Sequence, residues 1–169
     1  MNLLIVDDEY LVVEEVVTVT DWELLGITEI YSATNAVSAV RILNEKKIDI
    51  MICDIEMPQT DGLELSKKAK ENFPDLEIVM LTSHAEFNYV RNALRYGCYD
   101  YLLKPVMEDD IIKVMKNLVT KIERERHQAQ LQEEGIVWNQ LKPVWKEKYW
   151  EEMLRGLRDD CLLYTSPSP

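Results

Sequence analysis

The sequence contains few of the residues that mark fibrous, linker-like or disulfide-stabilised chains. Its 169 residues include only 5 glycines and 6 prolines, which argues against a collagenous chain or an unstructured linker. The three cysteines, Cys53, Cys98 and Cys161, are odd in number and widely spaced, so we expect free thiols rather than a zinc site or a disulfide framework. A hydrophobic content of 47% is enough to bury a core. The length suits one domain with an extension.

Long apolar runs and a basic N-terminal segment are also missing. No run approaches the roughly 18 residues that a membrane-spanning helix needs. The apolar segment that starts the chain has no basic residues before it, unlike a signal peptide. We therefore expect a cytoplasmic protein with no membrane partner.

Positive charge is scarce in the first two thirds of the chain. The formal net charge is −12. Residues 1–119 hold 22 acidic and 11 basic side chains, a balance of −11, whereas residues 120–169 hold 9 and 8. Such an acidic segment repels a phosphate backbone, so we expect no direct binding of nucleic acid by this chain.

Five short apolar runs alternate with stretches of helical periodicity. Runs this short and uninterrupted are typical of strands buried on both faces of a parallel sheet. We therefore expect an α/β fold, a doubly wound five-stranded parallel sheet of the (βα)5 type with strand order 2-1-3-4-5. The expected strands are 2–6, 27–32, 48–53, 76–81 and 99–103, and the expected helices are 11–19, 36–46, 63–72, 86–96 and one that begins near Glu108.

After Asn117 the chain becomes polar and helical. We expect a polar helix over at least 122–133, which Gly135 interrupts. A second amphipathic stretch, 138–157, has apolar residues at helical spacing and is broken only by Pro143. This apolar stripe needs a partner. A dimeric coiled coil is one interpretation of the helical stretch, although its apolar spacing is irregular.

The last nine residues fit neither pattern. Residues 164–169 resemble a translated sequencing adaptor, and a Ser-Pro-Ser-Pro ending cannot form a core. We therefore expect 161–169 to be a non-native or disordered tail, and we expect the natural chain to have continued.

Polar side chains stand at the carboxyl ends of four of the expected strands. Asp7 and Asp8 follow the first, Asp54 the third, Thr82 the fourth and Lys104 the fifth. In the order 2-1-3-4-5 these strands are consecutive neighbours, and ligands of open α/β sheets bind at this edge. The spacing therefore predicts a single site.

The side chains expected there suit phosphoryl transfer. At an effective dielectric constant of about 20, each close pair of carboxylates repels by about 3 to 4 kcal/mol, and a divalent cation relieves this repulsion. Ligands that are all oxygen, with room for water, favour Mg²⁺. With the ion bound, Asp54 can attack phosphorus while the Thr82 hydroxyl and the Lys104 ammonium hold phosphoryl oxygens.

Five motifs in order resemble a response regulator receiver domain of the CheY-like type. They are Leu-Leu-Ile-Val-Asp-Asp-Glu at 3–9, Asp-Ile-Glu-Met-Pro at 54–58, Asp-Gly at 61–62, Leu-Thr-Ser at 81–83 and Asp-Tyr-Leu-Leu-Lys-Pro at 100–105. The resemblance covers roughly residues 1–120. It implies a receiver domain at 1–120 and a helical connector at 121–160 that leads to a missing output domain.

The resemblance implies a role for each matching acidic residue. Asp54 would be the phosphoacceptor, taking the phosphoryl group from a histidine of a sensor histidine kinase. Asp8 and Asp54 would ligate Mg²⁺, Asp7 would contribute through water, and Glu56 would offer its backbone carbonyl.

It also implies a switch. Thr82 and Tyr101 would form the switch pair, the hydroxyl moving toward the phosphoryl group and the ring turning inward. Lys104 would bind a phosphoryl oxygen through a segment whose bond to Pro105 is cis, an isomer that proline makes accessible. The face formed by the fourth helix, fifth strand and fifth helix would then offer a dimer surface, so phosphorylation would favour a homodimer. The domain would be a self-phosphorylating switch, not a turnover enzyme.

Finer motifs resemble one subfamily. Asp-Trp-Glu at 21–23 and Glu-Phe at 86–87 resemble receivers of the YesN type, which precede AraC-type DNA-binding domains, and 141–156 is similar to their connector. The resemblance therefore implies transcription control through an output domain that this chain lacks.

The sequence bears on four alternative functions. A pseudo-receiver, which keeps the fold but is not phosphorylated, stays open. A phosphatase of the haloacid-dehalogenase type needs a second aspartate where Glu56 stands. A flavodoxin-like carrier needs a phosphate-binding loop where the acidic residues 7–9 stand, and a nucleotide hydrolase needs a Gly-rich loop that is missing.

Overall fold

The computed structural model describes the backbone of residues 1–58, 61–83 and 96–162, and within these ranges it describes side chains up to residue 137. The predicted helix at 86–96 lies, apart from its last residue, outside the described residues. The same is true of the last seven residues of the predicted tail.

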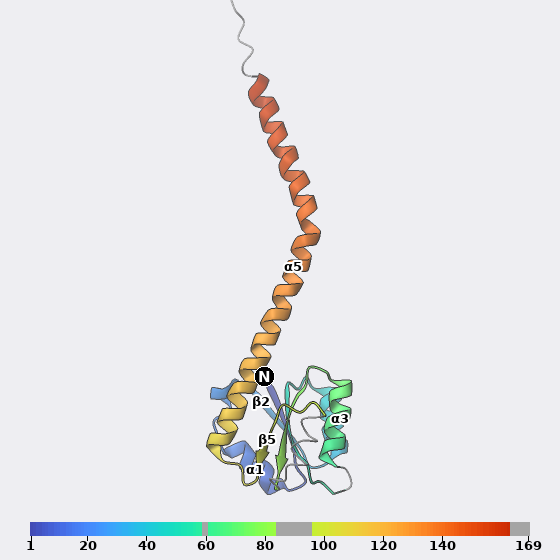
Figure 1. The fold of residues 1–169 in the computed structure, drawn as a ribbon, viewed down its shortest axis with the longest axis vertical. Helices are drawn as coiled ribbons and strands as arrows, with labels where there is room; N and C mark the ends of the chain where they lie inside the picture. The colour runs from blue at the N-terminus through green and yellow to red at the C-terminus, as the bar shows by residue number, and fades with distance from the viewer. Residues whose placement is uncertain (59–60, 84–95, 163–169) are drawn as a thin grey trace, which may run out of the picture. The chain divides into compact units, whose positions relative to one another are not determined.

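A parallel sheet forms the centre of the N-terminal part of the chain (Figure 1). The sheet has five strands in the order β2-β1-β3-β4-β5, which confirms the predicted fold class and strand order. All the strand pairs are parallel. The strands are β1 (Asn2–Val6), β2 (Glu29–Ala33), β3 (Ile50–Asp54), β4 (Glu77–Thr82) and β5 (Asp100–Leu103).

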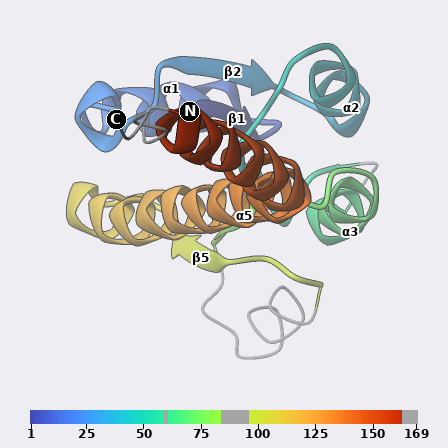
Figure 2. The ribbon, with the colours of Figure 1, turned by 90° about the horizontal axis from the view of Figure 1, so that it is seen from above.

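Helices cover both faces of the sheet, as parallel crossover connections require. Figure 2 shows α2 and α3 on one side and α1 with the first turns of α5 on the other. The helical elements are α1 (Tyr10–Thr18), the 3₁₀ turn η1 (Glu23–Leu25), α2 (Ala36–Glu45), α3 (Gly62–Asn72) and α5 (Glu108–Leu162).

The two middle strands of the sheet carry most of the core. Every residue of β3 and β4 is buried, which explains why both read as uninterrupted apolar runs in the sequence. Cys53 and Cys98 are free and buried in this core. Burial raises the pKa of the Cys98 thiol to about 11. Both cysteines therefore act as packing residues.

The second strand begins later than the sequence pattern indicated. The apolar run begins at Ile27, but β2 starts at Glu29. Ile27 instead closes the turn after η1, where its backbone N–H donates to the carbonyl of Trp22 at 3.0 Å. Gly26 precedes it with φ at 81°, a conformation that glycine adopts without strain. Ile27 is buried here as a turn residue and not as part of the sheet.

The predicted break in the C-terminal helix is wrong. Helix α5 runs without interruption from Glu108 to Leu162, through both Gly135 and Pro143. A glycine costs a helix only about 1 kcal/mol, and a proline removes one backbone hydrogen bond, so strong helix formers on either side can outweigh both. The helix also includes Cys161 and Leu162, which were expected to belong to the tail.

The chain divides into two compact units, Met1–Lys121 and Ile122–Pro169. The first unit contains the sheet and the first turns of α5, in which Ile111, Met115 and Leu118 are completely buried. Among the described residues, no helix is long and apolar enough to cross a membrane.

Candidate functional site

The structure brings the acidic residues and the lysine of the predicted site together at the carboxyl edge of the sheet. Asp7 comes directly after β1, Asp54 is the last residue of β3, and Lys104 comes directly after β5. The Lys104 Nζ atom lies 2.6 Å from Asp7 Oδ2 and 3.2 Å from Asp54 Oδ1. One ammonium therefore bridges two carboxylates that are 47 positions apart in the sequence.

Backbone contacts fix the position of Asp7. Its N–H donates to the carbonyl of Ala33 at the end of β2, at 3.1 Å. Its Oδ1 atom accepts a hydrogen bond of 2.9 Å from the backbone N–H of Glu9 and so closes the turn into α1. The side chain is fully buried. Oδ1 of Asp7 therefore stabilises the turn into α1, while Oδ2 contacts Lys104.

Lys104 is held by its backbone as well as by its charge. Its N–H donates to the carbonyl of Thr82 at 2.9 Å, which continues the pairing of β4 and β5. The peptide bond between Lys104 and Pro105 is cis, as the family resemblance implied. Burial alone would lower the pKa of Lys104, but the hydrogen bond to Asp7 and the charge of Asp54 outweigh it and raise that pKa above its usual value.

Asp54 lies in an environment that disfavours its charge. Burial raises the pKa of its carboxyl group, and the nearby charge of Asp7 raises it further. Lys104 and a backbone hydrogen bond from Glu56 oppose this effect without cancelling it, so the pKa lies above its usual value. The folded structure therefore disfavours the anionic form of Asp54, and added positive charge would stabilise that form.

The carboxylates also fit a hard divalent cation. Oxygen atoms of Asp7, Asp8 and Asp54 lie within 4.8 Å of one another, and the side chain of Asp8 is exposed. Asp7 Oδ2 is buried, and the Lys104 ammonium lies 2.6 Å from it. With three carboxylates and one ammonium the cluster has a formal charge of −2, and its all-oxygen donors suit Mg²⁺.

Two further predicted residues contact the cluster through their backbones: the Thr82 carbonyl accepts a hydrogen bond from the N–H of Lys104, and the backbone of Glu56 donates one to Asp54. Glu56 follows Asp54 by two positions and has an exposed side chain. Thr82, the last residue of β4, is 1% exposed. The part assigned to each in binding a metal or a phosphoryl group stays a prediction.

The strand register places Tyr101 on the same face of the sheet as Thr82. Tyr101 of β5 is paired with Met80 of β4, and Thr82 follows Met80 by two positions. Because side chains alternate along a strand, residues two apart point to the same face. Tyr101 is partly buried and packs against the core cluster that contains Met80.

The role of Gly62 could not be predicted from the sequence pattern. Helix α3 begins at Gly62, with Asp61 Oδ1 accepting a 2.9 Å hydrogen bond from the N–H of Leu63. A Cβ atom at Gly62 would also lie 1.8 Å from the backbone oxygen of Asp54. Only glycine lets α3 approach the end of β3 this closely, a requirement that no local pattern reveals.

Comparison with known proteins finds matches to the part of the chain that contains the sheet and the carboxylate cluster. A family model described as "Response regulator receiver domain" matches residues 3–116. A solved structure, the REC domain of AraT, a response regulator from Geobacillus stearothermophilus, aligns with a TM-score of 0.69 at 30% identity and covers 74% of this chain and 97% of that one.

Curated relatives include regulatory proteins longer than this chain. The transcriptional regulatory protein YesN of Bacillus subtilis is 34% identical over 124 residues, which are 73% of this chain and 34% of that protein. The response regulator SaeR of Staphylococcus aureus is 32% identical over 127 residues, which are 75% of this chain and 54% of that protein. The chain therefore spans about a third to a half of these relatives.

Proposed function

The chain belongs to the response regulator receiver family of two-component systems, and from this premise we propose that Asp54 accepts a phosphoryl group from a histidine of a sensor kinase. One observation carries the proposal: the carboxylate of Asp54 lies 3.2 Å from the ammonium of Lys104, within a group of three carboxylates. An isolated structural aspartate at a strand end would need neither the lysine nor the other two carboxylates.

The transfer is a substitution at phosphorus. A carboxylate oxygen of Asp54 forms the new P–O bond while the P–N bond of the phosphohistidine breaks, and the electron pair passes to the imidazole nitrogen, which takes up a proton. The product is an acyl phosphate on Asp54 and a neutral histidine on the kinase. Each domain is modified once, so the chain acts as a switch and not as a turnover enzyme.

The surrounding residues supply charge and orientation. The Lys104 ammonium, which already contacts Asp54 Oδ1, turns to a phosphoryl oxygen, and the buried Thr82 hydroxyl donates to another. Asp8 and Asp54 would hold Mg²⁺ together with the backbone carbonyl of Glu56, and Asp7 would contribute through water. When bound, Mg²⁺ supplies positive charge that offsets the carboxylates and the incoming phosphoryl oxygens.

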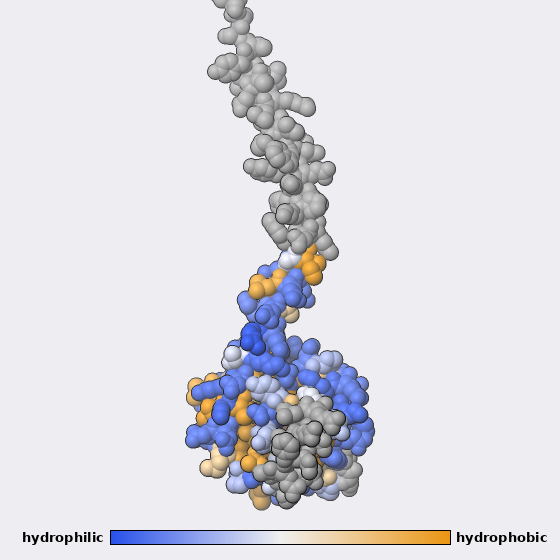
Figure 3. All heavy atoms as spheres, in the orientation of Figure 1, coloured by the Kyte–Doolittle hydropathy of each residue, from blue (hydrophilic) through white to orange (hydrophobic). Residues whose placement is uncertain are grey.

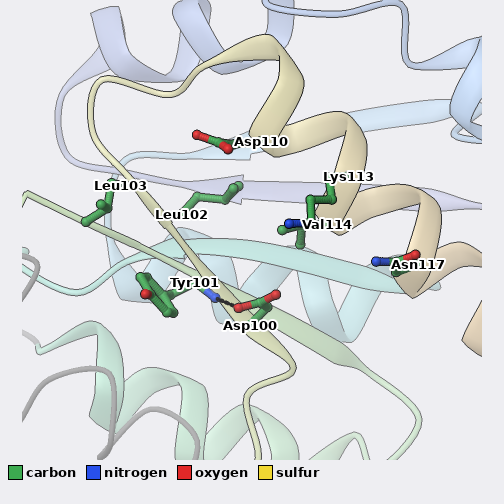
Figure 4. A pocket seen from close by; sticks show the side chains of 8 residues that line it. All are labelled: Asp100, Tyr101, Leu102, Leu103, Asp110, Lys113, Val114 and Asn117. Carbon is green, nitrogen blue, oxygen red and sulfur yellow. Dashed lines mark hydrogen bonds between the residues drawn. The ribbon is translucent and has the colours of Figure 1, made fainter. Parts of the chain in front are cut away.

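The signal leaves the site through β5. Movement of the Thr82 hydroxyl toward the phosphoryl group would open space on the sheet face that Tyr101 shares, and the partly buried ring would turn into it. Figure 4 shows the Tyr101 ring and the Leu102 side chain on opposite sides of β5, with Leu102 toward α5. An open pocket of about 280 Å³ lies between β5 and the first turns of α5.

A kinase surface is available beside the site. Tyr10 and Leu11, at the start of α1, are 62% and 75% exposed, and Met107, between β5 and α5, is 61% exposed. All three follow the carboxyl ends of strands and so lie at the edge where Asp54 is found. Exposed apolar side chains next to a reactive group favour a protein partner.

The output is proposed to be transcription control through a domain outside this chain. The similarity to YesN, which is named as a transcriptional regulatory protein, supports it, and the greater length of YesN and SaeR leaves room for an output domain. Helix α5 has exposed Leu131, Ile136 and Val137 beyond the sheet unit, and Figure 3 shows hydrophobic surface there. We propose that these side chains pair with a second copy after phosphorylation. Cytoplasmic localisation stays a prediction.

The test is phosphorylation by acetyl phosphate with Mg²⁺, followed by intact-mass measurement. We expect one added phosphoryl group in the wild type and in Asp75→Asn, a matched control because Asp75 is an exposed carboxylate outside the cluster. We expect none in Asp54→Asn, because an amide is not a nucleophile toward phosphorus, and none in the presence of a chelator.

The alternative is a pseudo-receiver that never carries phosphate. Absence of any added mass in the wild type would favour this alternative. Undiminished labelling of Asp54→Asn would show that the phosphoryl group is elsewhere, and undiminished labelling in chelator would exclude the role given to Mg²⁺.

A further inference from the structure

A second charged cluster lies at the opposite ends of the strands from the carboxylate cluster, at the amino end of β4. Glu77, the first residue of β4, is 8% exposed. Its Oε1 atom lies 2.9 Å from Lys121 Nζ and 3.4 Å from Lys70 Nζ. Lys70 comes from α3 and Lys121 from α5, so one carboxylate joins a strand to a helix on each face of the sheet.

The cluster has additional contacts that fix both lysines. Lys70 Nζ donates to the backbone carbonyl of Leu76 at 2.7 Å. The ammonium of Lys121 lies 5.4 Å from the centre of the Tyr99 ring, within the range of a cation–π contact. Each lysine therefore has a partner besides Glu77.

These contacts are less exposed than ordinary surface ion pairs, because the side chain of Glu77 is 10% exposed and those of Lys70 and Lys121 are 26% and 30% exposed. A carboxylate taken out of water must be compensated by nearby positive charge and hydrogen bonds, and removal of one partner of a buried pair is strongly destabilising. The chain offers a contrast in the pair of Glu64 and Lys68, 2.7 Å apart, whose side chains are 58% and 66% exposed. Such an exposed pair contributes little.

The position of Lys121 gives the cluster a function. Lys121 is the last residue of the sheet-containing unit, and α5 continues past it as one helix to Leu162. We propose that Glu77 is a positioning residue that clamps the last turn of α5 within the receiver to the start of β4, at the point where the connector helix leaves the domain.

The clamp is joined to the proposed phosphorylation site by a single strand. β4 carries Glu77 at its amino end and Thr82 at its carboxyl end, and all of its residues are buried. A displacement of β4 that accompanies phosphorylation would act on Lys121 through Glu77. This coupling rests on the proposed function, whereas the clamp itself does not.

Hydrogen exchange of the full chain tests the clamp without any phosphoryl donor. We expect Glu77→Gln to raise exchange over residues 114–121 by on the order of tenfold, because the neutral amide no longer attracts Lys121. Lys121→Met is a second variant for the case that Glu77→Gln does not fold. It keeps the aliphatic part of the side chain and leaves Glu77 paired with Lys70, and we expect it to raise exchange over the same residues. Glu64→Gln is the matched control and should change nothing there.

Three results would overturn the clamp: unchanged exchange over 114–121 in both variants, an equal rise throughout β1 and β3, or an equal rise in Glu64→Gln. The second result would mean that Glu77 contributes to general stability and not to a local attachment. Phosphorylation of Asp54, measured by intact mass, should be the same in Glu77→Gln as in the wild type, because Glu77 is at the far end of the strand.

The coupling has its own readout. In the wild type we expect acetyl phosphate with Mg²⁺ to change exchange over 114–121, and in Glu77→Gln we expect a smaller change. An equal change in both proteins, zero included, would overturn the coupling. Failure of Asp54 to be labelled in any protein would count against the proposed function alone, because the clamp is decided by the comparison without donor.

Discussion

Gly62 determines how the backbone at Asp54, the proposed phosphoacceptor, is held. Its backbone N–H donates to the carbonyl of Ile55 at 3.0 Å, and its missing side chain leaves space for the Asp54 carbonyl. The backbone around Asp54 therefore packs directly against the start of α3.

Gly62→Ala should lower the free energy of unfolding by about 2 kcal/mol, because the added Cβ meets backbone atoms that can move only together with a strand. Urea unfolding followed by circular dichroism measures this change. Gly135→Ala is the control, because nothing lies within 4 Å of its added Cβ. It should leave the receiver transition in place and favour the helix by about 1 kcal/mol. Equal transitions in both variants would contradict the argument.

The sequence predicted which side chains meet but not how each is held. Asp7, Asp54 and Lys104 could be grouped because parallel strands end at one edge of the sheet. The hydrogen bond from Glu9 to Asp7 and the contact of Gly62 with Asp54 depend on exact backbone geometry. Residue type and spacing do not specify that geometry.

Helix α2 has a defined start that is set by one side chain. Asn35 precedes the helix with an extended backbone, and its Oδ1 atom accepts a 2.9 Å hydrogen bond from the N–H of Ser38. The Ser38 hydroxyl also donates to this oxygen, at 2.9 Å. These contacts satisfy an N–H group that would otherwise have no partner within the helix.

Asn35→Ala should destabilise the receiver by about 1 kcal/mol, because the first turn of α2 loses its cap. Asn44→Ala is the matched control within the same helix. Asn44 is exposed and its side chain donates to the carbonyl of Val40 within the same helix, so its replacement by alanine should be neutral or slightly stabilising. Urea denaturation of both variants gives the comparison, and an equal loss of stability would show that the cap has no special effect.

Helices and strands could be predicted from the sequence where every residue of an element is buried. They were predicted wrongly where contacts with neighbouring parts of the chain determine the structure. β3 and β4 are buried throughout, so their apolar runs were unambiguous. Ile27 was assigned to a strand because it is apolar, although hydrogen bonding to Trp22 places it in a turn. Gly135 and Pro143 were expected to disturb α5 on local propensity, which neighbouring helical turns override.

The whole chain is acidic, and part of its negative charge is concentrated at the candidate site. The net charge is −12, and oxygen atoms of three carboxylates lie within 4.8 Å of one another, two of these groups in contact with Lys104. Ion binding to this cluster would stabilise the folded state, since the unfolded chain does not hold the carboxylates together.

Mg²⁺ at ten times its dissociation constant should stabilise the native protein by about 1.4 kcal/mol. The measurement is the thermal midpoint with MgCl₂ and with NaCl at equal ionic strength, which separates specific binding from screening. Asp8→Asn should lose most of the increase, because it removes an exposed ligand without removing a buried contact. Asp75→Asn should keep it, and an increase that survives in Asp8→Asn would exclude the assigned ligands.

Because the strands are parallel, distances from the carboxylate cluster increase along all of them in the same direction, which nuclear magnetic resonance can measure. A β-strand advances about 3.3 Å per residue, so the six residues from Glu77 to Thr82 separate the two edges by roughly 17 Å. Paramagnetic broadening falls steeply with distance. Mn²⁺ bound at the carboxylates would therefore broaden amide signals in a graded way along every strand at once, and the depth of each residue in the sheet could be determined from the width of its resonance.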